Sequence, residues 1–430
     1  MKRLKPILAA FLILLLAIGM TACGSGTAEA EDTTSEVAED VTKTVEPAEA
    51  VTTAANITAD GAIDASDLFS DRDLTQTADL SEAKTVTVSD GETVKITDKG
   101  VYVITGSAND AQILVEAAED AKVQLVLDSV SITNTSTPCI YVKSADKVFV
   151  TTTKSENTLS VTETFTADGT TNTDAVIFSK ADLTLNGLGT LTIESTDNGV
   201  TTKDDMKITG GAIDITCASD ALEANDSISV AEGTITISSR NNGLNASDDD
   251  DDTTGWIYIC GGKLDVTAGN NGVKAATIVQ IDSGVLTVTA YEGIEATCVQ
   301  INGGTIDITA TDDGINAGQK SSAYSPLIEI NGGELTVNMG QGDTDAIDSN
   351  GSIVVNGGTI DITAKSPFDY ELSGTYNGGT IIVNGETVNA ITNQMMGGMG
   401  MMGGMQPGGM QPGGMPQGGM PQGGPGGHRG

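Results

Sequence analysis

Short runs of alternating residues cover most of the chain between about residue 85 and residue 395. Val, Ile, Leu and Thr alternate with polar residues, and Gly, Asn and Asp separate the runs. A period of two is typical of strands with one buried face, and the separating residues are those that turns prefer. No segment has the period of a convincing amphipathic helix. The pattern therefore predicts an all-β protein with too many short strands for a single sandwich.

The strands belong to internal repeats in which a Gly-Gly pair, or its equivalent, precedes an alternating strand. Examples are residues 207–215, 259–266 and 301–308, and the second glycine falls at positions 211, 233, 262, 284, 304, 333 and 358. A period of about 21 residues with occasional insertions is typical of a solenoid coil with three strands. The longer spacings predict loops at 248–255, 318–326 and 340–344.

Stacking the units places like residues in columns. One predicted inward column is large and aliphatic: Leu191, Ile213, Ile235, Leu264, Leu286, Ile306, Leu335 and Ile360. A second holds small side chains: Ser195, Cys217, Ser239, Ala268, Ala290 and Ala310. A third is aliphatic again: Val200, Leu222, Leu244, Val273, Ile294, Ile315 and Ile347. Such columns bury a continuous core at the strand spacing, so we expect a right-handed parallel β-helix whose first coils and cap are residues 85–135.

The N-terminus has the pattern of a lipoprotein signal peptide over residues 1–22. A positive segment at residues 2–5 precedes apolar residues 7–18, and residues 20–23 form a lipobox that ends at Cys23. An apolar stretch this short, followed by small residues, is typical of a signal peptide rather than a membrane span. We therefore expect lipidation of Cys23 and anchoring at the extracellular face of the cell membrane by this lipid alone.

Composition divides the rest of the chain. Residues 23–55 are rich in Ala, Thr and Glu, and residues 395–430 are almost entirely Gly, Met, Pro and Gln. Neither segment can bury a core, so we expect an acidic disordered tether and a disordered tail around a folded domain at 56–394.

The formal net charge of the chain is −38, and removal of the signal peptide makes it −41. This charge excludes direct binding to nucleic acid or anionic lipid and suits a protein that lives in excess cation. Of the remaining cysteines, 139, 217, 260 and 298, the last three fall in different columns of the coil, so we expect free thiols. We also expect a monomer.

A short turn with candidate chemistry precedes each third strand. The turn column is Asp174, Asn198, Asp220, Asn242, Asn271, Glu292, Asp313 and Asp345, and the adjacent column is Thr201, Glu223, Asn245, Lys274, Glu295, Asn316 and Asp348. In the first half, alternating Asp and Asn can be satisfied by their own turn backbone and by stacked amides. In the second half the turn column holds three successive acids.

Like charges about 5 Å apart are costly in a partly buried site, so either their pKa values rise or a cation lies between them. Carboxylate and amide oxygens are the ligands of Ca²⁺, and the domain has no His for softer metals. The candidate calcium ligands are Asp220, Glu223, Glu292, Glu295, Asp312, Asp313, Asp343, Asp345 and Asp348. The run Asp248–Asp252 cannot converge on one ion, so we expect a solvated loop there.

Four features carry a family resemblance: the ladder repeats, the lipobox, the Gly/Met tail and the upstream segments 96–106 and 123–128. Together they resemble a clostridial family of carbohydrate-binding parallel β-helix lipoproteins, related in shape to pectate lyases. The resemblance implies binding of cellulose-like or acidic, pectin-like polysaccharide with bound Ca²⁺ and without clear lyase activity.

Three functions stay open at this point. In a binder, Ca²⁺ on the acidic face bridges to uronate carboxylates, and Trp256, Tyr258 and Tyr291, with Lys274, are candidate carbohydrate contacts. A calcium-dependent polysaccharide lyase needs a Lys or Arg base, for which Lys274 is the best candidate, although an ion pair with the acidic column also explains it. The third function is a passive surface scaffold or adhesin. A second aromatic group, Phe368, Tyr370 and Tyr376, is either a binding surface or a cap of the coil end.

Overall fold

The computed structural model describes residues 62–340 and 344–393. The chain divides into residues 1–50 and 51–430, and all described residues belong to the second unit. Cys23, the tether, the tail and Asp343 lie outside the described residues. Among the residues described, no helix is long and apolar enough to cross a membrane.

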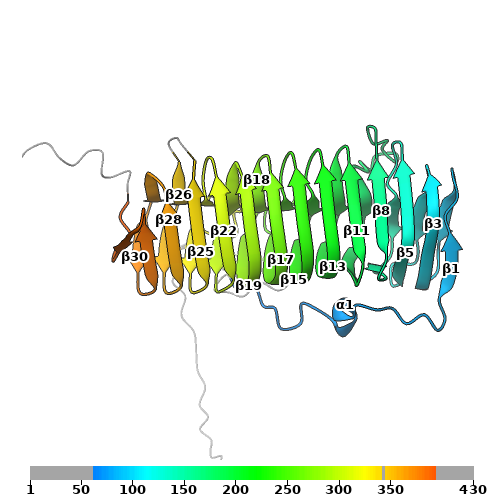
Figure 1. Ribbon diagram of the computed structural model, residues 1–430, viewed down its shortest axis with the longest axis horizontal. Coiled ribbons are helices and arrows are strands. Elements are labelled where there is room, and N and C mark those ends of the chain that lie inside the picture. The colour runs from blue at the N-terminus through cyan, green and yellow to red at the C-terminus, as the bar shows by residue number, and fades with distance from the viewer. Residues whose placement is uncertain (1–61, 341–343, 394–430) are drawn as a thin grey trace, which may run out of the picture. The chain divides into compact units, whose positions relative to one another are not determined.

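The described residues form an all-β structure of parallel sheets whose strands stack coil upon coil (Figure 1). The larger sheet has 20 strands. They are β1 (Lys84–Thr87), β3 (Gly100–Asn109), β5 (Lys122–Asn134), β7 (Lys147–Thr152), β8 (Glu156–Val161), β10 (Asp182–Gly187), β11 (Thr190–Ser195), β13 (Asp205–Cys217), β15 (Ser227–Ser239), β17 (Trp256–Ala268), β19 (Ile278–Ala290), β21 (Cys298–Ile301), β22 (Thr305–Ala310), β24 (Leu327–Ile330), β25 (Glu334–Met339), β27 (Ser352–Val355), β28 (Thr359–Thr363), β30 (Ser373–Tyr376), β31 (Thr380–Val383) and β32 (Glu386–Val388).

The smaller sheet has 12 strands. They are β2 (Thr93–Ile96), β4 (Gln112–Glu116), β6 (Ile140–Ser144), β9 (Ala175–Ser179), β12 (Asn198–Thr202), β14 (Leu222–Ala224), β16 (Leu244–Ala246), β18 (Asn271–Ala275), β20 (Glu292–Ala296), β23 (Ile315–Ala317), β26 (Asp345–Ser349) and β29 (Ser366–Tyr370).

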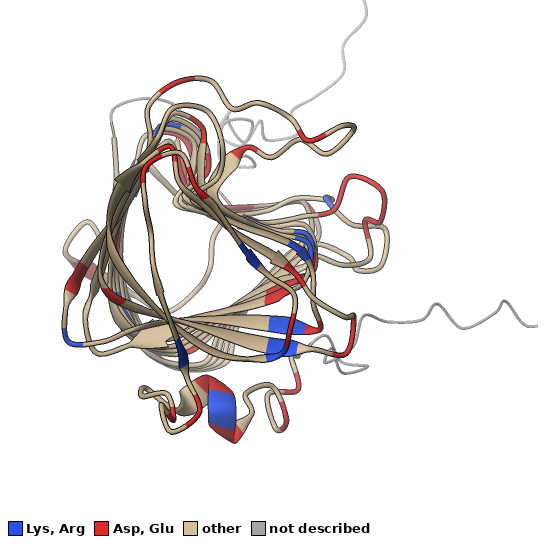
Figure 2. Cartoon of the chain, turned by 90° about the vertical axis from the view of Figure 1, so that its right-hand side faces the viewer, with Lys and Arg blue, Asp and Glu red and all other residues tan. Residues whose placement is uncertain are grey.

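Each full coil has three sides. The first side precedes the Gly-Gly corner, the second side follows it, and the smaller sheet is the third side. In β13, β15, β17 and β19 one long strand continues through the corner, whereas later coils divide it into two strands, as in β21 and β22. Figure 2 looks along the stack and shows many of the Asp and Glu residues at the turns and loops of its rim.

The corner requires glycine because its backbone turns through positive φ, as at Gly211 (82°) and Gly333 (84°). A Cβ added at Gly333 would lie 2.9 Å from the Gly303 backbone of the preceding coil. The predicted glycine series is confirmed, and the structure extends it by one coil to Gly379, which has a φ of 90°.

The predicted columns are also confirmed. Ile213 pairs with Ile235, Ile235 with Leu264, and the series continues in register to Ile360. On the third side the aliphatic column extends from Val200 to Ile347 and ends on Phe368. Both columns are buried, and Cys217 is a buried small residue paired with Ser239. At the start of the turn column the predicted register is wrong by one residue. Ala175, and not Asp174, pairs with Asn198.

The four predicted free cysteines are free thiols in the structure. Burial is the largest cause of the raised pKa of the Cys139 and Cys217 thiols, each to about 12. These two thiols therefore act as small core residues rather than as nucleophiles.

A segment outside the coils, the N-terminal strap (residues 62–80), runs along the first side (Figure 1). It contains the four-residue helix α1 (Asp71–Leu74), which begins with a capping box between Ser70 and Asp73. The carboxylate of Asp73 is buried and lies 2.7 Å from the ammonium of Lys147. At the other end of the strap, the Ile63 amide donates to Gln280 at 2.7 Å. The sequence pattern did not indicate this strap.

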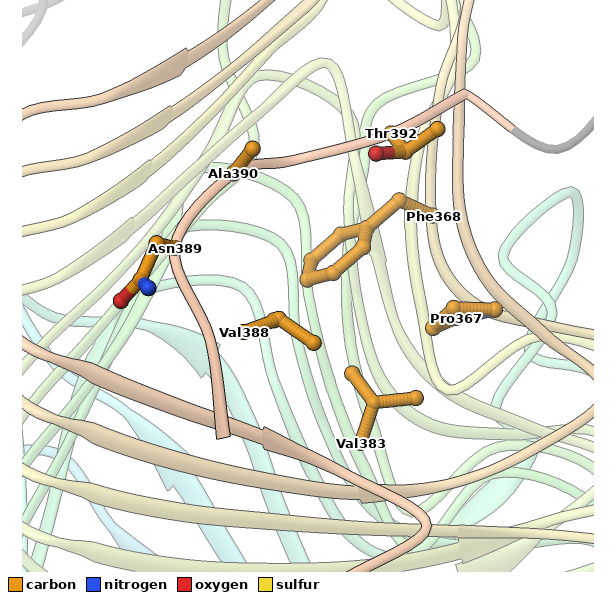
Figure 3. A pocket seen from close by; sticks show the side chains of 7 residues that line it. All are labelled: Pro367, Phe368, Val383, Val388, Asn389, Ala390 and Thr392. Atoms are coloured by element: carbon orange, nitrogen blue, oxygen red, sulfur yellow. The ribbon is translucent and has the colours of Figure 1, made fainter. Parts of the chain in front are cut away.

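The last coil is closed by the antiparallel pair β31–β32 and by apolar side chains. Phe368, Val383 and Val388 converge on an apolar hollow of about 400 Å³ beside Pro367 and Ala390 (Figure 3). Phe368 is buried and Tyr370 packs partly against the core. These aromatics therefore form the cap of the coil end.

Candidate functional site: the acidic turns of the third side

The candidate site lies where the third-side strands begin in the second half of the stack. Strands β20, β23, β26 and β29 pair in parallel, with Glu295 opposite Asn316, Asn316 opposite Asp348 and Asp348 opposite Asp369. The predicted adjacent column is therefore confirmed in its register. Asp369 is a further acid of this column that the sequence analysis missed, because the pattern there lacks the Asp-Gly turn.

Three of the predicted ligands converge. Each of Glu292, Asp312 and Asp313 offers a carboxylate oxygen within 4.8 Å of the other two. Burial, followed by the neighbouring charges of Glu295 and Asp313, raises the pKa of Glu292 to about 7. Burial and the Asp312 charge raise the pKa of Asp313 to about 6. The three acids, called the acidic cluster below, thus repel one another in a site that only partly hydrates them.

The acids of the next coils extend this arrangement. Burial raises the pKa of Asp348 to about 7, with further contributions from the charges of Asp313, Asp369 and Asp345. The backbone N–H of Asp345 donates to Asp313 Oδ1 at 3.4 Å, which joins the two coils. Oxygen atoms of several coils therefore face the same region.

Asn316 supplies an amide oxygen beside the acidic cluster. Its side-chain N–H donates to Asp313 Oδ2 at 3.2 Å, while its Oδ1 is buried and has no hydrogen-bond partner in the part of the chain described. A buried acceptor without a donor is unfavourable. Carboxylates and an unpaired amide oxygen together are the donor set that a hard cation such as Ca²⁺ takes.

Glu295, also a predicted ligand, is instead held by cations of the protein. Its side chain is buried and pairs with Lys274 at 3.9 Å and with Lys320. The Asn271 amide donates to the same carboxylate at 2.8 Å. The sequence left two roles open for Lys274, a lyase base or an ion pair with the acidic column. The structure shows the ion pair. Lys320 was missed because the loop at 318–326 brings it back across the coil.

In the first half of the stack, Asp220 and Glu223 have partners from the protein. Asp220 accepts hydrogen bonds from the Asn241 side chain at 2.7 Å, the Asn242 backbone at 2.9 Å and the Asn245 side chain at 2.9 Å. Glu223 lies 3.4 Å from Lys203 and accepts from the Asn198 amide. The amide ladder expected for this half is therefore present, and both predicted ligands have partners within the protein.

A polar hollow of about 470 Å³ lies over these residues and is lined by Asp248, Asp249 and Asp250 as well. The predicted solvated loop is correct for Asp250–Asp252, which are exposed. It is also correct for Asp249, which is exposed, and wrong only for Asp248, which is half-buried. Asp248 accepts from the Asn225 amide at 3.2 Å, and this contact turns the loop inward.

Two of the predicted sugar-binding aromatics are not available. Trp256 is 2% exposed and Tyr258 is 4% exposed, because Ile63 and Leu68 of the strap pack over them. The Tyr258 hydroxyl donates to Asp282 at 2.6 Å. The prediction that they share a binding surface with Tyr291 is therefore wrong. Tyr291 is 47% exposed, and the neighbouring charge of Asp312 raises its pKa, so it adjoins the acidic cluster.

A second convergence of acids was missed. Asp182, Asp204 and Asp205 each have a carboxylate oxygen within 4.8 Å of the others, at the opposite end of the third-side strands. Burial raises the pKa of Asp182 to about 7, with further contributions from Asp204 and Asp205. The Ser227 hydroxyl donates to Asp205. Aligning the residues that follow each third-side strand, and not only those that precede it, would have shown this group.

Comparison with known proteins identifies the class. A family model described as "Carbohydrate-binding domain-containing protein" matches residues 90–344 and 292–369, so the chain belongs to this family. A protein of Acetivibrio thermocellus with the same description is 40% identical over 134 residues, which are 30% of this chain and 46% of that protein. The match thus spans less than half the length of this relative.

A solved structure is also similar, with 24% sequence identity and a TM-score of 0.42. Its title is "Structure of the polysaccharide lyase-like protein from C. thermocellum, Gadolinium derivative". The similarity covers 60% of this chain and 97% of that one.

Proposed function

We propose that this protein binds polysaccharide without cleaving it, and that Ca²⁺ at the acidic cluster bridges the protein to uronate carboxylates of an acidic, pectin-like polymer. The observation that carries the proposal is the convergence of Glu292, Asp312 and Asp313 within 4.8 Å. The membership in a carbohydrate-binding family supports the polysaccharide as the partner. The protein is a right-handed parallel β-helix, lipidated at Cys23 and displayed on the cell surface as a monomer.

The bridging role of the ion follows from charge. The chain has a net charge of −38, and a polyuronate is also an anion, so direct contact between them is repulsive. Ca²⁺ takes six to eight oxygen ligands, and the acidic cluster with Asn316 supplies only part of that number. The remaining positions are those that a uronate carboxylate fills.

The environment of Lys274 supports binding rather than lyase chemistry. A lyase base must be uncharged when it takes the C5 proton of the sugar. Lys274 lies 3.9 Å from the buried Glu295 carboxylate and serves there as a counter-charge.

Terbium luminescence tests the ion site, because Tb³⁺ takes the same oxygen ligands as Ca²⁺ and is excited through nearby tyrosine. Tyr291 adjoins Asp312, so we expect Tb³⁺ emission that Ca²⁺ competes away. The variant Glu292→Gln/Asp313→Asn should lose this emission, and Glu156→Gln, an exposed acid elsewhere, should keep it. Emission unchanged in the double variant would place the ion elsewhere.

Retention on immobilised polygalacturonate tests the partner. We expect the wild-type protein to be retained with Ca²⁺ and released by EDTA, and the double variant to pass through in both conditions. Ultraviolet-absorbing unsaturated product would instead show a lyase, and absence of retention would favour the passive scaffold.

A further inference from the structure

The apolar hollow at the C-terminal end of the coil is open where the inner coils are closed. On the third side each column residue lies against its equivalent in the next coil, as Ile315 does against Ile347 and Ile347 against Phe368. Strand β29 ends the smaller sheet, so no further strand of the part of the chain described stacks on Phe368. Val383 and Val388, which line the same hollow, are only half-buried. An apolar coil end of this kind needs a cap.

The last residues that the structure describes are tied to the coil end beside this hollow. Ile391 is buried against the core. The side-chain amide of Asn393 donates to the backbone oxygen of Tyr370. Thr392, which lies between them, lines the hollow (Figure 3). The point from which residues 394–430 continue is therefore fixed at the rim of the hollow.

The sequence after this point is suited to fill an apolar hollow. Methionine is the only residue with a large apolar side chain after position 393, and six of these nine methionines fall within residues 395–405. Methionine side chains are unbranched and flexible, so they fill irregular apolar gaps. The proximal methionines are Met395, Met396, Met399, Met401, Met402 and Met405, and the distal methionines are Met410, Met415 and Met420.

Charge and strand pairing favour this segment over a second copy of the chain as the occupant. Residues 394–427 contain no Asp, Glu, Lys or Arg, and no charged side chain lines the hollow. A second copy would bring its own excess of acids to a coil end that carries Asp369 and Glu386, so the two copies would repel each other. Strand β31 is already paired with β32 and offers no free edge to another chain on that side.

We propose that the proximal methionines fold back into the hollow and close the C-terminal end of the coil, while the distal methionines stay outside it. The segment is joined directly to the rim, so its effective concentration at the hollow is high. The volume of about 400 Å³ lies in the range of small-ligand sites, which leaves room for more than one methionine side chain. The inference needs neither the ion nor the polysaccharide of the proposed function and can fail without them.

Oxidation by hydrogen peroxide tests the inference, because peroxide converts an accessible methionine thioether to the sulfoxide and a buried one is shielded. The rate at each methionine of the full chain is measured by peptide mass spectrometry, in native buffer and in guanidinium. Met206 is 0% exposed and gives the rate of a buried methionine. We expect at least two proximal methionines to react at least about tenfold more slowly than the distal ones in native buffer, and equally fast in guanidinium.

A matched pair of variants locates the shielding. Val388→Asp places a charge in the hollow, whereas Thr387→Asp places the same charge on its exposed neighbour in β32. We expect Val388→Asp to bring the proximal methionines to the rate of the distal ones, and Thr387→Asp to leave them shielded. Met206 should stay shielded in both variants, which shows that the coils are folded.

Equal rates for proximal and distal methionines in the native wild type would overturn the inference. Shielding that increases over about a hundredfold range of protein concentration would overturn it in favour of a second copy at the coil end. Shielding that survives Val388→Asp would assign the proximal methionines to another surface.

Discussion

The two halves of the turn column have the same backbone but satisfy their acids in different ways. Around Asp220 the neighbouring coils contribute asparagines, and three N–H groups surround one buried carboxylate. Around Glu292 and Asp313 the neighbouring coils contribute more acids, and their pKa values rise to about 7 and about 6. A ladder of stacked coils can therefore be completed by amides or left with acids that repel one another, according to which residue the next coil supplies.

The boundary between the halves is Glu295, and its two lysines give the largest expected effect. Removing both, in Lys274→Met/Lys320→Met, leaves a buried carboxylate without a counter-charge. We expect a loss of about 3 kcal/mol in the free energy of unfolding at neutral pH, measured by urea denaturation. Lys263→Met is the control because Lys263 is exposed, and it should change stability by less than about 0.5 kcal/mol. An equally mild double variant would show that the two lysines are not what stabilises the buried Glu295 carboxylate.

In the first half of the turn column, where asparagines surround Asp220, the stability of the protein should depend on Asp220 and not on calcium. Asp220→Ala removes the acceptor of three hydrogen bonds and leaves buried amide donors unpaired, which should cost about 2–3 kcal/mol. The loss should be the same in Ca²⁺ and in EDTA, as measured by thermal unfolding in both buffers. A loss that appears only in Ca²⁺ would mean that this half also holds an ion.

In the acidic half, removal of carboxylates should stabilise the calcium-free protein, whereas removal of Asp220 destabilises it. In EDTA at pH 8, Glu292→Gln/Asp313→Asn removes repulsion and should raise the melting temperature of the protein. In the wild type, Ca²⁺ at 100 times its dissociation constant should add about 2.7 kcal/mol, and the double variant should lose this increment. A double variant less stable than wild type in EDTA would contradict mutual repulsion as the state of the empty cluster.

The pH dependence of the calcium-free protein should give the smallest effect. Glu292, Asp313 and Asp348 have folded-state pKa values raised to about 7, 6 and 7, above their usual range. The folded state then binds more protons than the unfolded state, so the stability from these groups is complete below about pH 4 and declines as pH rises to about 7. We expect the melting temperature to fall by a few degrees between pH 5 and 8 in EDTA, and the calcium increment to grow. Asp73 has a pKa lowered to about 2, so it contributes stability near neutral pH. This contribution is lost as the pH falls, and only in more acidic solution.

The candidate site could be predicted in part because coil register is a local property. Glu292, Asp312 and Asp313 were assigned together from the turn pattern, and the structure brings them within 4.8 Å. Lys320 and Asp369 could not be assigned in the same way, since one comes from a loop insertion and the other from a coil with an irregular turn. Trp256 and Tyr258 were predicted as exposed because nothing in their own strand indicates that Ile63 and Leu68 cover them.

The sequence by itself determined the coil: the glycine corners, the aliphatic columns and the register of the acids all follow from a short repeat, because each coil contacts its neighbours through equivalent positions. Only the tertiary structure decided which acids are neutralised and which surfaces are open. These outcomes depend on segments outside the repeat, such as the strap and the loop that carries Lys320, whose contacts lie up to 217 residues away along the chain. A local pattern carries no information about such contacts, because they are set by where the folded coil places distant residues.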